Sequence, residues 1–165
     1  YRAESNSRAL IKKFSNTNIY NNNMPKNSAC KTLYEFAEKI RCELLGSQIL
    51  KGVEINFVDN YKNKLDELNK KLPKTKEDVS ILEAFEIYMI KSLFNIKLNN
   101  SSKDILNHWS SELDKAFQKH ISFFKENLHI SSIERSIFFH NHRKRKPTCV
   151  CFRILLWKRK ILRIF

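Results

Sequence analysis

The scarcity of glycine and proline is the feature that most restricts what this chain can fold into. Only two glycines and three prolines occur among 165 residues, too few for the many tight turns of a β-sandwich or β-barrel. Leucine, glutamate and lysine, which favour helices, are plentiful. Since 42% of the residues are hydrophobic, a chain of this length can hide about two-thirds of its unfolded surface in one core. We therefore expect an all-α fold, a small bundle of about five helices.

Apolar residues recur at steps of three and four along five segments, which is the spacing of amphipathic helices. A polar stretch, residues 15–27, has the composition of a linker between the first two. Gly52 inside the third segment costs about 1 kcal/mol relative to alanine, so we expect it to permit a close helix contact. The segments run from Ala3 to Phe14, from an N-cap at Ser28 to a stop at Gly46, from Leu50 to Leu72 before Pro73, from a capping box at Thr75 and Asp78 to Leu93, and from an N-cap at Ser102 to Leu128.

The net charge of +14 is concentrated near the C-terminus. Residues 1–130 hold 21 Lys/Arg and 16 Asp/Glu, whereas residues 131–165 hold 10 and 1. The second stretch alternates basic and apolar residues without a stable period, which predicts a poorly structured tail. We accordingly divide the chain into a helical region, residues 1–132, and a basic tail, residues 133–165, that is disordered or arose from a frameshift near Arg135.

The basic tail also supports an alternative function. Residues 143–146 and 153–163 could bind nucleic acid or an anionic membrane, because a basic surface gains free energy when phosphates release their counterions. Phe152 and Trp157 are too few to form a convincing platform for base stacking. The favoured interpretation therefore has no nucleic-acid partner.

Motifs for catalysis are absent from the sequence. It contains no Gly-rich phosphate loop, GxSxG, HExxH or CxxC. His108 and His120 are twelve residues apart, too far to bind one metal, and the HxH and CxC of the tail lack the usual spacing of a structural zinc site. Four cysteines indicate reduced thiols and a cytoplasmic protein, and no apolar run approaches the roughly 20 residues that span a membrane. We expect no catalytic residue and no bound metal or cofactor.

One group of charged residues and glycines interrupts the regular helical pattern. Glu38, Arg41 and Glu43 fall opposite the apolar residues of the second segment, so we expect them to face outward or toward a partner. A simpler interpretation is a solvated face, with Glu38 and Arg41 as an i,i+3 pair that contributes a few tenths of a kcal/mol. Gly46, Gly52 and Asn56 follow at short intervals.

This order of residues resembles the T subunit of aerobic cobaltochelatase. That family carries a Glu, then Arg-x-Glu, then a Gly, and six residues later a Gly that leads into Asn-Leu. The sequence has the same order from Glu38 to Asn56, with Phe57 in place of the Leu. The start is similar too, since Arg2, Glu4, Ala9 and Leu10 fit the family's Arg-Gly-Glu-Ala-Asp-x-x-Ala-Leu. Ala3 stands for the Gly and Asn6 for the Asp. The resemblance covers roughly residues 1–132.

The resemblance implies a part in an ATP-dependent machine that inserts Co²⁺ into a corrin ring in cobalamin synthesis. The T subunit of that family couples an AAA+ ATPase subunit to a large tetrapyrrole-binding subunit, and the complex uses ATP, Mg²⁺ and Co²⁺. Its C-terminal domain carries Asp-x-Ser-x-Ser, which this sequence lacks, so we expect a truncated, non-catalytic subunit. Glu38, Arg41, Glu43 and Asn56 would then be partner-binding residues, and Gly46 and Gly52 structural ones.

Overall fold

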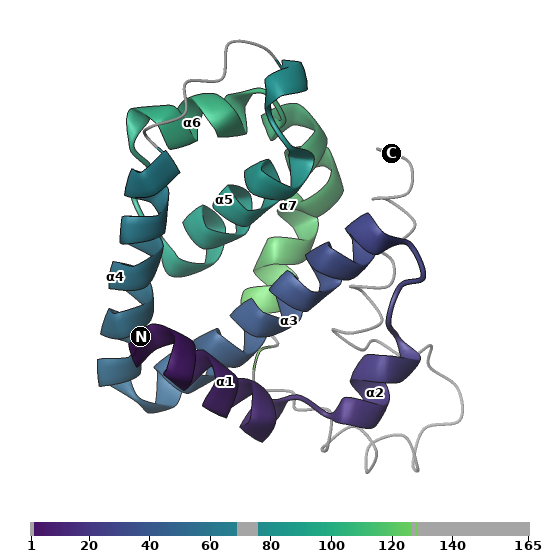
Figure 1. The fold of residues 1–165 in the computed structure, drawn as a ribbon, viewed down its shortest axis with the longest axis vertical. Coiled ribbons are helices and arrows are strands. Elements are labelled where there is room, and N and C mark those ends of the chain that lie inside the picture. The colour runs from purple at the N-terminus through teal and green to yellow at the C-terminus, as the bar shows by residue number, and fades with distance from the viewer. Residues whose placement is uncertain (1, 69–75, 127, 129–165) are drawn as a thin grey trace.

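The computed structural model describes residues 2–68, 76–126 and 128, and these residues form an all-α fold (Figure 1). The predicted fold class is confirmed, with seven α-helices and one 3₁₀ turn in the described part. The α-helices are α1 (Arg2–Phe14), α2 (Thr17–Asn22), α3 (Ser28–Ile49), α4 (Lys51–Leu68), α5 (Ile81–Phe94), α6 (Asn100–Asn107) and α7 (Ser110–Glu126).

Four helices begin at a side chain that accepts a hydrogen bond from the first turn, which satisfies a backbone N–H that has no partner inside the helix. The predicted caps, Ser28 and Ser102, do not cap their helices. Asn27, one residue before Ser28, caps α3, and Asn99, three residues before Ser102, caps α6. The predicted capping box is displaced as well: Asp78 ends the 3₁₀ turn Lys76–Asp78, and Thr75 lies outside the described residues. The observed caps are Asn16 for α2, Asn27 for α3, Ser80 for α5 and Asn99 for α6.

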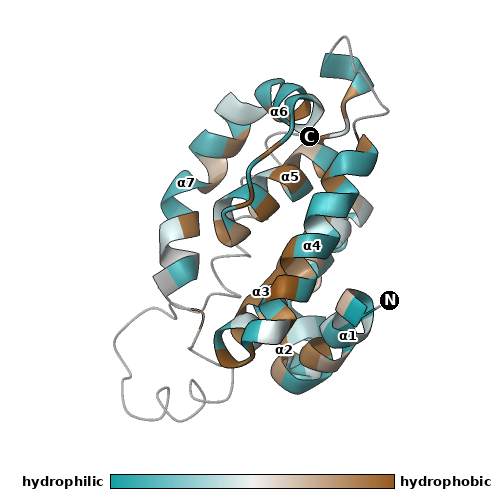
Figure 2. Cartoon of the chain, turned by 90° about the vertical axis from the view of Figure 1, so that its left-hand side faces the viewer, coloured by the Kyte–Doolittle hydropathy of each residue, from teal (hydrophilic) through white to brown (hydrophobic). Residues whose placement is uncertain are grey.

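Helix α3 forms the centre of the fold. It packs against α1, α4 and α5, and Figure 1 shows it running through the middle of the molecule. Its buried residues include Glu38, Arg41, Glu43 and Ser47 as well as apolar ones. The more peripheral helices α4 and α7 alternate between hydrophilic and hydrophobic residues along their length (Figure 2). Helix α3 also continues through Gly46, the predicted stop, to Ile49. The three helices that pack against α3 therefore bury polar as well as apolar residues of it.

Aromatic rings connect α3 to the second half of the fold. Phe36 of α3 meets Phe85 of α5 edge-on, with ring centroids 6.3 Å apart. Phe85 in turn packs against Phe117 of α7 at 5.3 Å. Edge-to-face pairs of this kind contribute about 0.5–1.5 kcal/mol each beyond the area that they bury.

Two connections differ from the prediction. The polar stretch 15–27 contains the short helix α2, which Tyr20 anchors by stacking on Tyr34 of α3 at 5.2 Å. The fifth predicted segment is two helices, because the chain breaks at His108 and Trp109. Trp109 Nε1 donates a 3.1 Å hydrogen bond to Val79 O, which fixes this corner to the start of α5.

Some predictions fall outside the described residues. These are the end of the third segment at Pro73 and the prediction that the basic tail, from residue 133 onward, is disordered or arose from a frameshift. In the described ranges, no helix combines the length and the apolar character needed to cross a membrane.

Candidate functional site

The three charged residues of the family-like motif lie inside the fold. Glu38, Arg41 and Glu43 are only 5%, 6% and 1% exposed. The prediction that they face outward or toward a partner is therefore wrong. The apolar stripe from Leu33 to Leu44 covers one side of α3, but α1 and α4 also pack against this helix, and Arg41 and Glu43 bond to them. Burial obliges each of these charges to find an internal partner.

Glu38 and Arg41 form a buried two-pronged ion pair. Arg41 Nε donates to Glu38 Oε2 at 2.8 Å, and Arg41 Nη2 donates to Glu38 Oε1 at 2.6 Å. The same Nη2 donates to the backbone carbonyl of Phe14 at 2.9 Å. Phe14 is the last residue of α1, so its carbonyl has no acceptor role within the helix. Arg41 thereby neutralises Glu38 and fastens the end of α1 to α3.

Glu43 joins α3 to α4. Its Oε2 accepts a 2.6 Å hydrogen bond from the Tyr61 hydroxyl, and its Oε1 lies 3.9 Å from Lys39 Nζ. Lys39 Nζ also lies 3.6 Å from Glu4 Oε2 of α1. Burial raises the pKa of Glu43, although the Tyr61 hydrogen bond partly offsets this shift, and burial next to Glu43 raises the pKa of Tyr61. Tyr61 was not predicted as a site residue, although it occupies a core position between Phe57 and Leu65.

A thiol lies beside the Glu38–Arg41 pair. Cys42 Sγ is 3.6 Å from Arg41 Nη2 and 3.9 Å from Glu38 Oε1. Burial raises the pKa of Cys42 to about 12, so the thiol stays protonated at neutral pH. A protonated, buried thiol is a poor nucleophile and a poor metal ligand.

The two glycines of the motif have different surroundings. A Cβ added at Gly46 would overlap the Cδ atoms of Leu10 and lie 3.0 Å from its Cγ, so the lack of a side chain at Gly46 makes room for Leu10 of α1. At Gly52 an added Cβ would meet no atom within 4 Å. The predicted close contact at Gly52 is therefore wrong. Asn56, the last residue of the motif, is half-buried on α4.

The arrangement holds three helices together and offers no chemistry to a substrate. We name Glu38, Arg41, Glu43 and Tyr61 the polar clamp. In the part of the chain that the structure describes, no three His, Cys, Asp or Glu side chains are placed to hold a metal ion. These residues do not fit Mg²⁺ or a nucleotide bound through it, and they give no donor set for Co²⁺.

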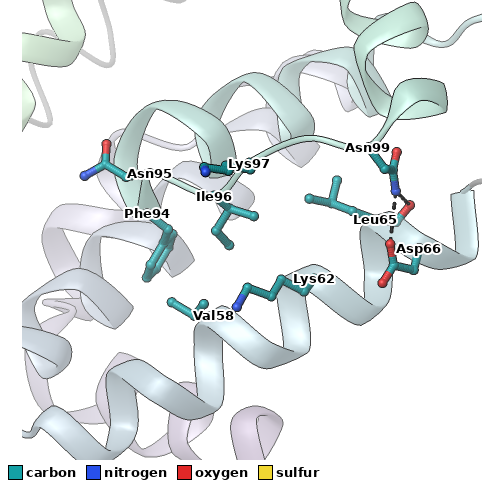
Figure 3. A pocket seen from close by; sticks show the side chains of 9 residues that line it. All are labelled: Val58, Lys62, Leu65, Asp66, Phe94, Asn95, Ile96, Lys97 and Asn99. Atoms are coloured by element: carbon teal, nitrogen blue, oxygen red, sulfur yellow. Dashed lines mark hydrogen bonds between the residues drawn. The ribbon is translucent and has the colours of Figure 1, made fainter.

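Two surface cavities are lined by residues that the structure describes. One, of about 700 Å³, lies between α1, α2 and α3, and its acidic side chains are already paired: Glu35 with Lys31, Glu38 with Arg41 and Glu86 with Lys64. The other, of about 470 Å³, lies between α4 and the α5–α6 connection. We name the second cavity the α4–α5 slot (Figure 3). Its lining residues are Val58, Lys62, Leu65, Asp66, Phe94, Asn95, Ile96, Lys97 and Asn99.

One protein family matches this chain. The family model described as cobalamin biosynthesis protein CobT matches residues 1–129. No curated protein and no solved structure matches. The matched range contains every described helix, the whole polar clamp and the α4–α5 slot.

Proposed function

Because the chain belongs to the family of the cobalamin biosynthesis protein CobT, we propose that it serves as a non-catalytic scaffold subunit in the cobaltochelatase of cobalamin synthesis. The family match confirms the resemblance inferred from residues 38–56 and gives the chain a role in cobalamin biosynthesis. The finer proposal is that its helical region holds an AAA+ ATPase subunit and a large tetrapyrrole-binding subunit together in the cytoplasm.

The observation that carries the scaffold role is the internal use of the polar clamp. The charged groups of the motif bond to one another and to the end of α1. Arg41 donates hydrogen bonds both to Glu38 and to the carbonyl of Phe14. Groups used in this way stabilise a rigid surface but are not available to a reacting molecule. In this proposal, ATP hydrolysis and corrin binding are tasks of the two partner subunits.

Reconstitution tests the proposal. The full chain is mixed with the separately purified ATPase and tetrapyrrole-binding subunits, and the molar mass of the mixture is measured by size-exclusion chromatography with light scattering. We expect a complex that contains the chain and a chain that has no cobalt-insertion activity alone. If the chain elutes by itself at micromolar concentrations of all three proteins, the scaffold proposal is wrong.

The alternative function, a module that binds nucleic acid or an anionic membrane, rests on residues 143–163, outside the described residues. It predicts binding to DNA or to anionic vesicles that weakens steeply with salt, because each phosphate contact releases counterions. The scaffold proposal predicts no such binding at 150 mM salt.

A further inference from the structure

The α4–α5 slot combines an apolar floor with two lysines. Val58 and Phe94 are half-buried, and Ile96 is buried at the base. Figure 3 shows Phe94 and Ile96 pointing from the α5–α6 connection toward α4, while Lys62 lies along the opposite rim with its amine toward Val58. The slot is therefore a place where an apolar side chain could be buried next to positive charge.

The two lysines of the slot are available to a partner. Lys62 and Lys97 are exposed, and within the described residues neither forms an ion pair. By contrast, Lys64, on the same helix, is paired with Glu86, and Lys76 is paired with Glu112. Asp66 also lines the slot, where its Oδ1 accepts a hydrogen bond from Asn99. With two lysines against one carboxylate, the slot is positive and favours an anionic partner.

The slot is closed at one end and open at the other. Asn99 Nδ2 donates to Leu65 O at 2.8 Å and to Asp66 Oδ1 at 3.2 Å, which joins the two rims (Figure 3). At the other end, Ile55 precedes Val58 and Lys62 by three and seven residues, so the three share one face of α4. Ile55 is 61% exposed. An extended apolar path thus leads along α4 from Ile55 into the slot.

We propose that the α4–α5 slot and Ile55 form the docking surface for an acidic segment of a partner subunit, with apolar side chains on Val58, Phe94 and Ile96 and carboxylates on Lys62 and Lys97. The slot, of about 470 Å³, has the size for a few side chains, which suits a peptide segment better than a folded surface. The identity of the partner rests on the proposed function, whereas the chemistry of the contact rests on the slot itself.

Charge reversal tests the slot in the reconstituted complex. Full chain carrying Lys62→Glu and Lys97→Glu is titrated against each partner subunit, and binding is compared with a control in which exposed Lys26 and Lys119 are changed to Glu. The control has the same net charge. We expect the slot variant to bind one subunit about tenfold more weakly or worse, and the control to bind like the wild type. If the wild type, the slot variant and the control all bind that subunit with equal affinity, the slot proposal is wrong.

Two further measurements check the same surface. Ile55→Ser should weaken binding to the same subunit several-fold without lowering Tm, because Ile55 is exposed in the free chain. Carbodiimide coupling should join Lys62 or Lys97 to an Asp or Glu of the partner. Cross-links from Lys62 or Lys97 to a second copy of this chain, with no partner link, would instead make the slot a self-association surface and overturn the proposal.

The two proposals fail in different ways. If the wild-type chain binds neither partner subunit, the proposed function fails, and so does the identity that we assign to the partner of the slot. If the wild-type chain binds a subunit and the slot variant binds it equally well, the scaffold role stands and the slot proposal fails.

Discussion

Arg41 Nη2 lies 2.9 Å from the carbonyl oxygen of Phe14, so a side chain in the middle of α3 caps the C-terminal end of α1. Arg41 is held in position for this contact by the two hydrogen bonds that it donates to Glu38. The contact joins residues 27 positions apart in the sequence. It explains why an Arg and a Glu are buried in α3.

Removing Arg41 alone should destabilise the fold more than removing both partners of the ion pair. Arg41→Met leaves the Glu38 carboxylate buried without its counter-charge and should cost about 3–5 kcal/mol. The double variant Glu38→Leu, Arg41→Met should recover most of that loss, because two apolar side chains of similar volume replace the pair. Urea unfolding of the wild type, the two single variants and the double variant measures the free energy of unfolding of each. Simple additivity of the two single changes would contradict the account.

The two glycines should respond oppositely to added side chains. Gly46→Val should cost about 1–3 kcal/mol because its side chain overlaps Leu10. Gly52→Ala, at a helical position with open space, should stabilise by up to about 1 kcal/mol. Thermal unfolding of both variants provides the measurement. The change Leu10→Ala in the Gly46→Val background should restore part of the loss, and a loss that persists would mean that Leu10 is not the obstacle.

The raised pKa of Glu43 predicts a definite pH dependence. Because burial raises the pKa of Glu43 above its unfolded value, folding favours the protonated form. The stabilising contribution of Glu43 is fully present below the unfolded pKa and is lost as pH rises through the folded pKa. The free energy of unfolding of the wild type, relative to Glu43→Gln, should therefore fall as pH rises from about 4 toward neutrality.

Glu4 is the matched control for this titration. Lys39 nearby lowers the pKa of Glu4, so its contribution is present above the unfolded pKa and is lost as pH falls through the folded pKa. Relative to Glu4→Gln, the wild type should therefore gain stability as pH rises. If the comparisons with Glu43→Gln and Glu4→Gln show the same pH trend, burial does not raise the pKa of Glu43.

The full chain should neither hydrolyse ATP nor bind Co²⁺ tightly. The sequence has no phosphate loop, and the described residues bring together no set of metal ligands. Calorimetric titration with CoCl₂ and a phosphate-release assay give the two measurements. Stoichiometric cobalt binding at micromolar affinity that is lost on changing one histidine would reveal a site that we have missed.

The helices could be predicted from periodicity, but the environment of the motif could not. The spacing of Leu33, Phe36, Ile40 and Leu44 was sufficient to predict α3. The spacing of Glu38 and Arg41 also indicated their i,i+3 pair. The contacts of Arg41 with Phe14 and of Glu43 with Tyr61 come from α1 and α4, and periodicity within one helix carries no information about distant partners. One signal was present, since Tyr34, Cys42 and Leu45 extend the apolar surface of α3 beyond a single stripe and indicate a central helix.

The predicted roles of Gly46 and Gly52 were wrong for a related reason. Gly52 looks costly inside a helix, yet it lies in the exposed first turn of α4, where no neighbour requires it. Gly46 looks like a helix end, yet it is required by the approach of Leu10 from a different helix. Which glycine admits a neighbour depends on how helices cross, and that is decided by the packing of the whole core.

Hydrogen exchange of the backbone amides tests the polar clamp, the central structural claim, most directly. The exchange rates of the full wild-type chain are compared with those of Arg41→Met under native conditions. If Arg41 fastens α1 to α3, amides of α1 should exchange about 30-fold faster or more in the variant. Amides of α5 and α7 should lose no more protection than the fall in global stability accounts for. Unchanged protection of α1 would show that Arg41 does not act as a clamp on α1.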